Sequence, residues 1–553
     1  MALRGSLNGT AGRWRRLIGA SLGASDGRAR TGTINTSGQD GEILVAGVPV
    51  ASGRSGSGSL VVKRVGWALL GLQLVGMLAF STVQYSRFAL TKDFATFSQA
   101  WWAIAGGHLD PWSSVLGIRF WRNDSEFALW ALAPLHFIGI GPVLLLWVQD
   151  LAVVATELVA FGWILEILER SALSRRGAAL VVVGAVVVMC ADPWVYETIA
   201  FDLHITVFAG LFALLAGRDL WAGRTRRLWL WVPLALASEA LGGLYLVGVG
   251  IAGLLAGRRT RLVGLLLVGI GVAWVSLLGA LGGTGLGGHG VDRWYGYLVG
   301  PHHGHIGMVD IVLGALRHPG TALHLAGSRV NVVLTFLVVV GFVGIVVPWG
   351  LGPALVVFVP SMLNVNPSFL RPQASFQSWP ALPFVLVASV MVLVWLVTSG
   401  SRRRVVGVAG TVVWAVLLAD QALTALPTIP RYWIDVSAPA AARLAALARQ
   451  APTGTEVVAS NEVIGRFGAR PYVYALGSSP GSATFGAVRP IPVHGTRVLF
   501  VITPELDVNQ LSVRQSDAAL GYLEHSLHAR VLVHADGVDA LLWRPPPGTT
   551  HVF

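Results

Sequence analysis

The sequence predicts an α-helical polytopic membrane protein with about eleven transmembrane helices, followed by a small C-terminal α/β domain outside the membrane. Three observations predict this fold class. Only 12% of the 553 residues are charged and 54% are hydrophobic, whereas a soluble domain carries about 25% charged residues. Apolar runs of about 20 residues, the length that crosses the hydrocarbon, recur between residues 66 and 424. From residue 428 onward the apolar runs become short and β-like.

The first 60 residues differ from the rest of the chain. They are rich in Gly, Ser and Arg, as in "ASGRSGSGSL", and cannot bury enough apolar surface to fold alone. We therefore predict a disordered cytoplasmic tail over residues 1–60. The apolar run at 66–84 is too long and too far into the chain for an ordinary cleaved signal peptide, so we interpret it as a retained anchor. It opens a multispan domain over 61–427 with an outer loop at 85–142.

The candidate spans are ten apolar runs, at 66–84, 143–167, 177–191, 204–220, 228–257, 262–282, 329–347, 351–363, 380–399 and 404–424. The fifth run is long enough to hold two short spans, broken at "SEALGG". Arg clusters such as "ERSALSRRG" and "SGSRRRVVG" fall in alternate loops, which the positive-inside rule assigns to the cytoplasm with the N-terminus. An odd number of spans then places residues 428–553 on the extracytoplasmic side.

The charge distribution also limits the functions. The net charge of +12 does not indicate a nucleic-acid partner, because the Arg clusters lie between apolar runs as topology signals do. The composition excludes a soluble enzyme. In the C-terminal domain, "TEVVAS", "RPYVYAL", "TRVLFVIT" and "ARVLVHA" are typical of strands. The segment "SVRQSDAALGYLEHSLH" predicts a helix that begins at a Ser.

The first candidate site is the stretch "TKDFATFSQAWWAIAGGHLDPW" directly after the first span. Phe and Trp residues recur at steps of three and four residues, which predicts an amphipathic helix. We expect this helix to lie in the membrane interface with its aromatic side chains among the headgroups. Asp93 would stand at the start of the helix, either as its N-cap or as a functional carboxylate. Gln99, Trp101 and Trp102 follow on the same helix as candidate substrate-binding residues.

Three further groups lie on the predicted outer side. Asp202 and His204 begin a span, and on an extended segment both side chains would point to one side, where they could bind a divalent cation or relay protons. Capping of a helix by Asp202 is the structural alternative. Glu239 is the only acid between two apolar arms, so it is either an intramembrane functional carboxylate or a residue at the outer interface. Arg371 is one of few outward Arg residues and could hold a lipid phosphate or anchor at headgroups.

Several motifs together resemble a known family. Their order is "KDFATFSQAWWAIAGGH", "APLHFIGIGPVLLLWVQDLAV", "FDLHITVFAGLFALLAG", "ALASEALGGLYLVGVGI" and "VPSMLNVNPSFLRPQASFQSWPALPF". This series resembles the bacterial polytopic membrane proteins of the domain-of-unknown-function family 2079, over most of residues 65 to 545. That family is similar to the C-type, multispan glycosyltransferases, which take sugars from polyprenyl-phosphate donors at the outer face.

The resemblance implies roles for individual residues. The catalytic acid of those enzymes, in the first outer loop, matches Asp93. The acid–His element of family 2079 after the third span corresponds to Asp202 and His204. The family's Lys-Glu-Asp-like element in the middle span is reduced here to Ser238, Glu239 and Ala240. A glycosyltransferase would use Asp93 as a general base on an acceptor hydroxyl, with a glycan or protein as acceptor. Arg371 would offset the phosphate charge of the donor.

The alternative is a non-catalytic membrane protein that serves envelope assembly or the export of lipids or polymers. It needs only the spans, the outer domain and a groove that binds headgroups. In an enzyme, Asp93, Asp202 and Glu239 should converge on one outward cavity with a lateral opening to lipid.

Overall fold

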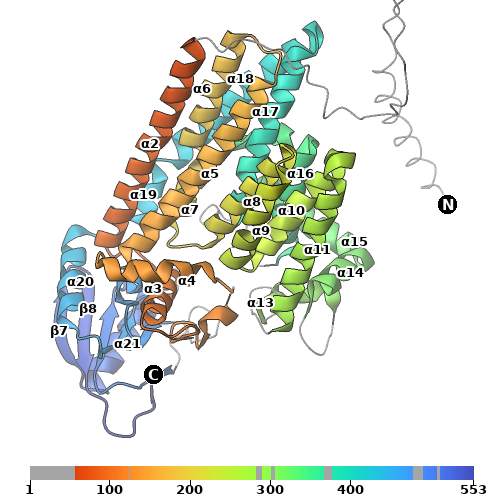
Figure 1. Cartoon of the computed structure of the whole chain (residues 1–553). Coiled ribbons are helices and arrows are strands. Elements are labelled where there is room, and N and C mark those ends of the chain that lie inside the picture. The colour runs from red at the N-terminus through yellow and green to blue at the C-terminus, as the bar shows by residue number, and fades with distance from the viewer. Residues whose placement is uncertain are drawn as a thin grey trace, which may run out of the picture. The chain divides into compact units, whose positions relative to one another are not determined.

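The computed structural model describes residues 57–123, 125–281, 289–300, 306–365, 376–477, 490–506 and 511–553. The predicted tail, residues 1–60, lies outside this part of the chain except for its last four residues, which open helix α2 (Figure 1). Everything below concerns the described residues.

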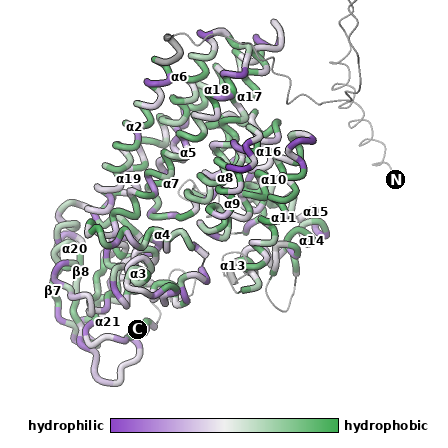
Figure 2. The backbone as a smooth tube through the Cα atoms, viewed as in Figure 1, coloured by the Kyte–Doolittle hydropathy of each residue, from purple (hydrophilic) through white to green (hydrophobic). Residues whose placement is uncertain are grey.

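Seven helical segments in the described part of the chain are long and apolar enough to cross a membrane. They are formed by α2 (Ser57–Ser86), α5 (Val143–Glu169), α6 (Arg175–Ala191) with α7 (Pro193–Ala200), α11 (Arg258–Ala280), α15 (Pro319–Val339), η6 (Trp379–Ala381) with α17 (Leu382–Thr398), and α18 (Ser401–Ala425) with α19 (Thr428–Trp433). Hydrophobic residues run along most of these helices (Figure 2). The chain is therefore a multi-pass membrane protein.

Shorter helices fill the intervals between the long ones. They are α3 (Lys92–Ala105), α4 (Ala128–Leu132), η2 (Ala133–Ile138), α8 (Thr206–Trp221), α9 (Thr225–Ser238), α10 (Leu241–Ala256), α13 (His289–Val299), α14 (Met308–Arg317), η3 (Phe342–Val346) and α16 (Pro348–Leu363). Every predicted span contains a helix. The break predicted within 228–257 is confirmed, because α9 ends at Ser238 and α10 begins at Leu241. The total of about eleven spans stays a prediction, since α8, α9 and α10 are each shorter than the about 20 residues that cross a bilayer.

Glycines bring helix α10 into close contact with its neighbours. A Cβ on Gly264 of α11 would lie 2.6 Å from the backbone oxygen of Gly250, and one on Gly352 of α16 would lie 2.2 Å from the oxygen of Gly248. Small residues let membrane helices approach closely, and van der Waals packing then holds them. This packing fixes α10 and, with it, the Glu239 that precedes the helix.

The C-terminal region is a five-stranded sheet in the order β4-β3-β6-β8-β7. The strands are β3 (Glu456–Ala459), β4 (Val473–Ala475), β6 (Val498–Ile502), β7 (Arg530–Ala535) and β8 (Val538–Trp543). The first three strands of that order are parallel, and the last two pair antiparallel. Helices α20 (Ala438–Gln450) and α21 (Val513–His525) accompany the sheet, and β5 (Ile491–Pro492) pairs with β9 (His551–Val552). All four predicted strand segments and the predicted helix are confirmed. Ser512 caps that helix, since its hydroxyl accepts from the Gln515 amide.

The outer loop and the sheet region share one core. The loop contains α3, β1 (Trp112–Ser113), β2 (Ile118–Arg119) and η1 (Phe120–Arg122). Phe88, Ala95 and Val115 of this segment pack with residues of the sheet and of α20 in one buried cluster. The backbone N–H of Gly465, in η7 (Ile464–Phe467), donates to Leu90 O at 2.8 Å. Figure 1 shows α3 beside the sheet.

Replacing Gly468 with Ala should weaken this docking by roughly 1–3 kcal/mol, because overpacking forces the backbone to shift. The added Cβ would lie 2.0 Å from Ser98 Oγ and 2.6 Å from Ala95 O on α3. We expect a lower melting temperature of the detergent-purified protein and faster proteolysis of the outer loop. Gly454→Ala is the control, since a Cβ there meets no atom within 4 Å. Equal melting of the two variants would contradict the close docking.

Candidate functional site at the start of helix α3

Helix α3 begins at Lys92 with Thr91 as its N-cap. The Thr91 side chain accepts a hydrogen bond from the Asp93 N–H at 3.3 Å. The interpretation of Asp93 as the N-cap is therefore wrong: the cap lies two residues earlier, and Asp93 is in the first turn. A carboxylate in the first turn still interacts favourably with the helix dipole.

A second carboxylate, that of Asp202, binds the same helix end from a distant part of the chain. Its oxygens accept from the Thr91 N–H at 3.0 Å, from the Thr91 hydroxyl at 2.5 Å and from the Phe94 N–H at 3.3 Å. Capping by Asp202 was the structural alternative, and the helix that it caps is α3. Asp202 has a φ of 51°, in the left-handed region. The extended Asp-x-His arrangement is therefore wrong, and such backbone strain in a residue other than glycine is typical of functional sites.

Asp93 and Asp202 form an electrostatically coupled pair beyond the ends of the spanning helices. Burial and, to a smaller extent, the charge of Asp93 raise the pKa of Asp202 to about 7, although the hydrogen bonds donated by Thr91 and Phe94 lower it. Burial also raises the pKa of Asp93, while the neighbouring Lys92 lowers it. Because Asp93 acts on Asp202 as a charged neighbour, Asp93 is the member that ionises first and Asp202 is the member that keeps its proton.

The surroundings of the Asp93 carboxylate differ from those of Asp202. Asp93 is half-buried, and its carboxylate accepts none of the hydrogen bonds found among the described residues. Asp202 is fully buried, with its oxygens bonded to the start of α3. Asp93 is thus the carboxylate of the pair that can accept a proton from a bound molecule.

His204 is a neutral histidine in an aromatic stack. Burial lowers the pKa of His204 to about 3, opposed by a hydrogen bond with the Phe201 backbone. The imidazole lies parallel to the rings of Phe201 and Phe376, with ring centroids 5.1 and 3.4 Å away. A neutral imidazole cannot attract an anion by its charge, but it can donate or accept a hydrogen bond.

Gln149 of α5 holds the Asp202–His204 segment and was missed as a site residue. Its Oε1 accepts from the His204 N–H at 2.5 Å, and its Nε2 donates to Asp202 O at 2.8 Å. The signal was present in the sequence, since "VQD" interrupts an apolar span with two polar residues, and polar residues inside spans are costly. Gln149 is completely buried.

Glu239 joins the same region through helix α8. It lies between α9 and α10 with an extended backbone and is buried. Its Oε2 accepts from the hydroxyl of Thr206, the first residue of α8, at 2.9 Å. The structure therefore brings Asp93 and Asp202 together, and it connects Glu239 to the segment that follows His204.

The remaining candidates on α3 face the protein interior. Gln99 donates to Ser114 Oγ at 2.8 Å and to the backbone oxygens of Arg470 and Pro471, and it accepts from the Ser114 N–H at 3.0 Å. Trp101 is fully buried, donates to Leu132 O at 2.8 Å and packs edge-on against the ring of His136. Trp102 is half-buried. The polar atoms of Gln99 and Trp101 are occupied by the protein.

The expected placement of this helix in the headgroups is wrong. The aromatic face of α3 packs in a buried cluster with residues of α4, α5 and the segment after Asp202. The opposite face contacts the sheet region through Ser98 and Gln99. Arg371 lies outside the described residues. Among the residues that are described, no three His, Cys, Asp or Glu side chains are grouped so that they could hold a metal ion.

Together the fold and this site define an α-helical membrane protein that holds a coupled pair of carboxyl groups beyond its spanning helices. The chain belongs to the family described as predicted membrane protein (DUF2079), whose model matches residues 85–482. The match covers Asp93, Asp202, His204 and Glu239, so the family resemblance found in the sequence is confirmed.

A solved structure is also similar to the chain. It is the crystal structure of ArnT from Cupriavidus metallidurans bound to undecaprenyl phosphate, with 12% sequence identity and a TM-score of 0.44 over 88% of this chain and 98% of that one. No curated protein matches the chain significantly.

Replacing Gln149 with Met should destabilise the protein by about 1–3 kcal/mol, because the His204 N–H and the Asp202 carbonyl would lose their buried partner. Met conserves most of the volume, so the loss reports hydrogen bonding. Thermal unfolding in detergent measures it. Gln421→Met, at a half-exposed position of α18, is the matched control and should melt like wild type. A Gln149→Met variant that melts with its control would contradict the positioning role.

The free energy of unfolding should fall as the pH rises from about 4 to about 7. The folded protein holds the Asp202 proton more tightly than the unfolded chain, because the pKa moves from 3.8 to about 7 on folding. This contribution is complete at low pH and is lost as the pH passes through the folded-state pKa. Asp202→Asn should flatten the profile. The test is to measure the melting temperatures of wild type and Asp202→Asn across this pH range. If both depend on pH with the same slope, the raised pKa assigned to Asp202 is wrong.

Proposed function

We propose that this protein is a membrane glycosyltransferase that moves a sugar from a polyprenyl-phosphate donor to an envelope acceptor at the outer face. The observation that carries the proposal is the coupled Asp93–Asp202 pair. The Asp202 carboxyl group is fixed by hydrogen bonds to the start of α3, whereas the half-buried Asp93 carboxylate accepts no hydrogen bond among the described residues. Membership of the family supports it, because the resemblance of that family to the C-type glycosyltransferases implies that Asp93 matches their catalytic acid.

In the proposed reaction, Asp93 is the general base. Its carboxylate accepts the proton of an acceptor hydroxyl, and the hydroxyl oxygen then attacks the anomeric carbon of the sugar. The bond between that carbon and the phosphate oxygen breaks, and the polyprenyl phosphate leaves with the bonding electron pair. The new glycosidic bond forms on the opposite face, so the reaction inverts the configuration. Burial raises the pKa of Asp93, which makes its carboxylate a stronger base.

Asp202 would position the base rather than act on the sugar. It fixes the first turn of α3, and by retaining its proton it allows Asp93 to ionise beside it. Neutral His204 and Glu239, held by Thr206, would orient the acceptor through hydrogen bonds. Arg371 and the exposed edge of Trp102 remain proposed contacts for the phosphate and for the sugar or prenyl chain. Gln99 and Trp101 would support the site through packing.

The proposed topology places this chemistry where the substrates are. A cytoplasmic N-terminus puts the end of α2, and hence α3, on the extracytoplasmic side together with the sheet region. The donor's prenyl tail would stay in the bilayer while its sugar reaches Asp93. The acceptor, a glycan or a protein, would approach from the side of the sheet.

Asp93→Asn should reduce sugar transfer about 100-fold or more, since general base catalysis contributes at least that much. The assay uses the purified full-length protein, radiolabelled polyprenyl-phosphate sugars and envelope extract as acceptor. Asp536→Asn, an exposed acid of the sheet region paired with Arg443, is the control and should keep wild-type activity. The same assay with and without EDTA tests the predicted divalent cation.

Two results would count against the enzyme. Equal transfer by wild type and Asp93→Asn would remove Asp93 from the mechanism. Transfer from no donor at all, by a protein shown to be folded, would favour the non-catalytic alternative in envelope assembly or export.

A further inference from the structure

A second pair of carboxyl groups lies inside the membrane-spanning part of the protein, away from helix α3. Glu157 belongs to α5, and Asp192 stands at the junction of α6 and α7. Both are buried, with 3% and 4% of their surfaces exposed. Neither takes part in the proposed reaction. An acidic residue at this depth is costly and calls for a functional explanation.

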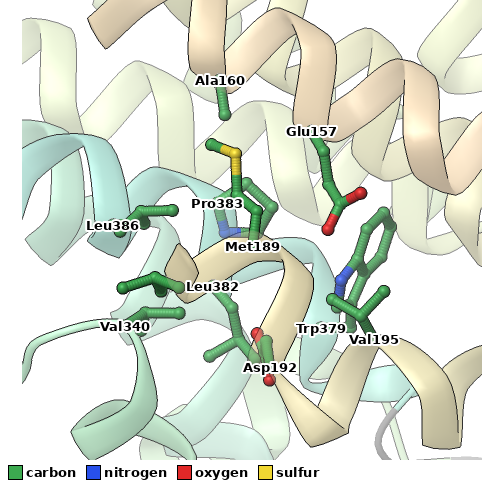
Figure 3. Close-up of a pocket in the computed structure, with 11 residues that line it drawn as sticks. Glu157, Ala160, Met189, Asp192, Val195, Val340, Trp379, Leu382, Pro383 and Leu386 are labelled. Carbon is green, nitrogen blue, oxygen red and sulfur yellow. The ribbon is translucent and has the colours of Figure 1, made fainter. Parts of the chain in front are cut away.

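The two acids line one small cavity. Its volume is about 20 Å³, room for one or two water molecules. The rest of the lining is apolar, with Met189 from α6, Val340, Trp379 and residues of α17. Figure 3 shows the Glu157 and Asp192 side chains on this cavity. Glu157 and Asp192 are the two ionisable residues of the lining.

The described residues donate hydrogen bonds to only some of the oxygens of these two carboxyl groups. Asp192 Oδ1 accepts from the Trp194 N–H at 2.9 Å and so caps α7. Glu157 Oε1 accepts from Gln73 Nε2 of α2 at 3.2 Å. Glu157 Oε2 is buried and has no hydrogen-bond partner in the described part of the chain. That oxygen lacks the donor that a buried polar atom requires.

No basic side chain is recorded beside the pair in the described residues. The Gln73 amide donates to Glu157, and the other titratable groups near the pair are the Cys190 thiol and the Tyr196 hydroxyl, which donates to Cys190 O at 2.9 Å. The thiol contacts the Gln73 carbonyl at 3.5 Å. Two negative charges would therefore lie on one apolar cavity without a compensating positive charge, and burying uncompensated ions is strongly unfavourable.

We infer that Glu157 and Asp192 form a proton-binding site within the membrane, in which one proton is shared between the two carboxyl groups through the cavity. A proton fits better than a metal ion. A cation such as Ca²⁺ takes 6–8 oxygen ligands, whereas this cavity offers two carboxyl groups and space for one or two waters. If Glu157 carries a proton at Oε2, this group becomes a hydrogen-bond donor toward the Asp192 side of the cavity, where the described residues provide none to Oε2.

The test uses a carbodiimide, dicyclohexylcarbodiimide, on the full-length protein in detergent. The reagent modifies carboxyl groups that hold a proton in apolar surroundings: the proton moves to a carbodiimide nitrogen, and the carboxyl oxygen attacks the central carbon. Peptide mass spectrometry should find the adduct on Glu157. We expect the adduct to be lost in Glu157→Gln and unchanged in Glu169→Gln, which alters a surface acid at the end of the same helix, paired with Lys63.

Asp192→Asn tests the sharing of the proton. Asn can still cap α7, so the variant removes the charge and keeps the helix start. Without that charge Glu157 should lose its proton more easily, and labelling should disappear at a lower pH than in wild type. Labelling with an unchanged pH dependence would overturn the shared site. If sodium chloride protects Glu157 from labelling and choline chloride does not, the site binds a metal cation and the proton-binding proposal is wrong.

Infrared spectroscopy gives a second readout that needs no reagent access. A protonated carboxyl group shows a C=O stretch that shifts in D₂O. The wild-type spectrum minus that of Glu157→Gln should contain such a band, because Asp202 contributes equally to both proteins and cancels in the difference. Absence of the band from this difference would overturn the proposal. Neither experiment measures sugar transfer, so its outcome is independent of the proposed glycosyltransferase activity.

Discussion

The part of this protein that surrounds helix α3 depends on one interaction, the binding of the Asp202 carboxyl group to the first turn of α3. The first amides of a helix have no partner within the helix, and Asp202 supplies one from a position 111 residues after Thr91. This contact joins the first outer loop to the junction of α7 and α8. Because Asp93 follows Thr91 by two residues, any structure that satisfies Asp202 also brings the two carboxyl groups together. Their coupled ionisation follows directly from that placement.

The burial of α3 on two sides keeps this arrangement in place. One face packs against α4 and α5, and the other contacts the sheet region. The helix therefore cannot slide or turn without breaking the hydrogen bonds of Gln99 and Trp101. Gln99 and Trp101, which the sequence suggested as substrate-binding residues, thus stabilise the position of α3. They hold rigid the turn that carries Asp93. This rigidity suits the proposed role of Asp93 as a base, because a base must be held in a fixed geometry to be effective.

The sequence could predict the elements but not their long-range partners. Apolar runs of spanning length locate the helices, the break before Glu239 follows from "SEALGG", and Ser512 marks the start of α21. These features depend on neighbours in the sequence. The cap on α3 depends on a residue 111 positions away and on a left-handed φ at Asp202, which no local pattern requires. Gln149 was missed for the same reason, since its partners lie 53 and 55 residues further along the chain.

The two carboxyl pairs share one physical plan. In each pair one acid is fixed at the start of a helix, Asp202 on α3 and Asp192 on α7, where backbone amides stabilise the carboxyl group. The other acid, Asp93 or Glu157, has an oxygen to which the described part of the protein donates nothing. Helix α7, eight residues long, has Asp192 as its N-cap and ends two residues before Asp202. A change of charge at Glu157 and Asp192 would act on the N-terminal amides of α7. The C-terminal end of that short helix leads directly into the segment that contains Asp202, which is coupled to Asp93.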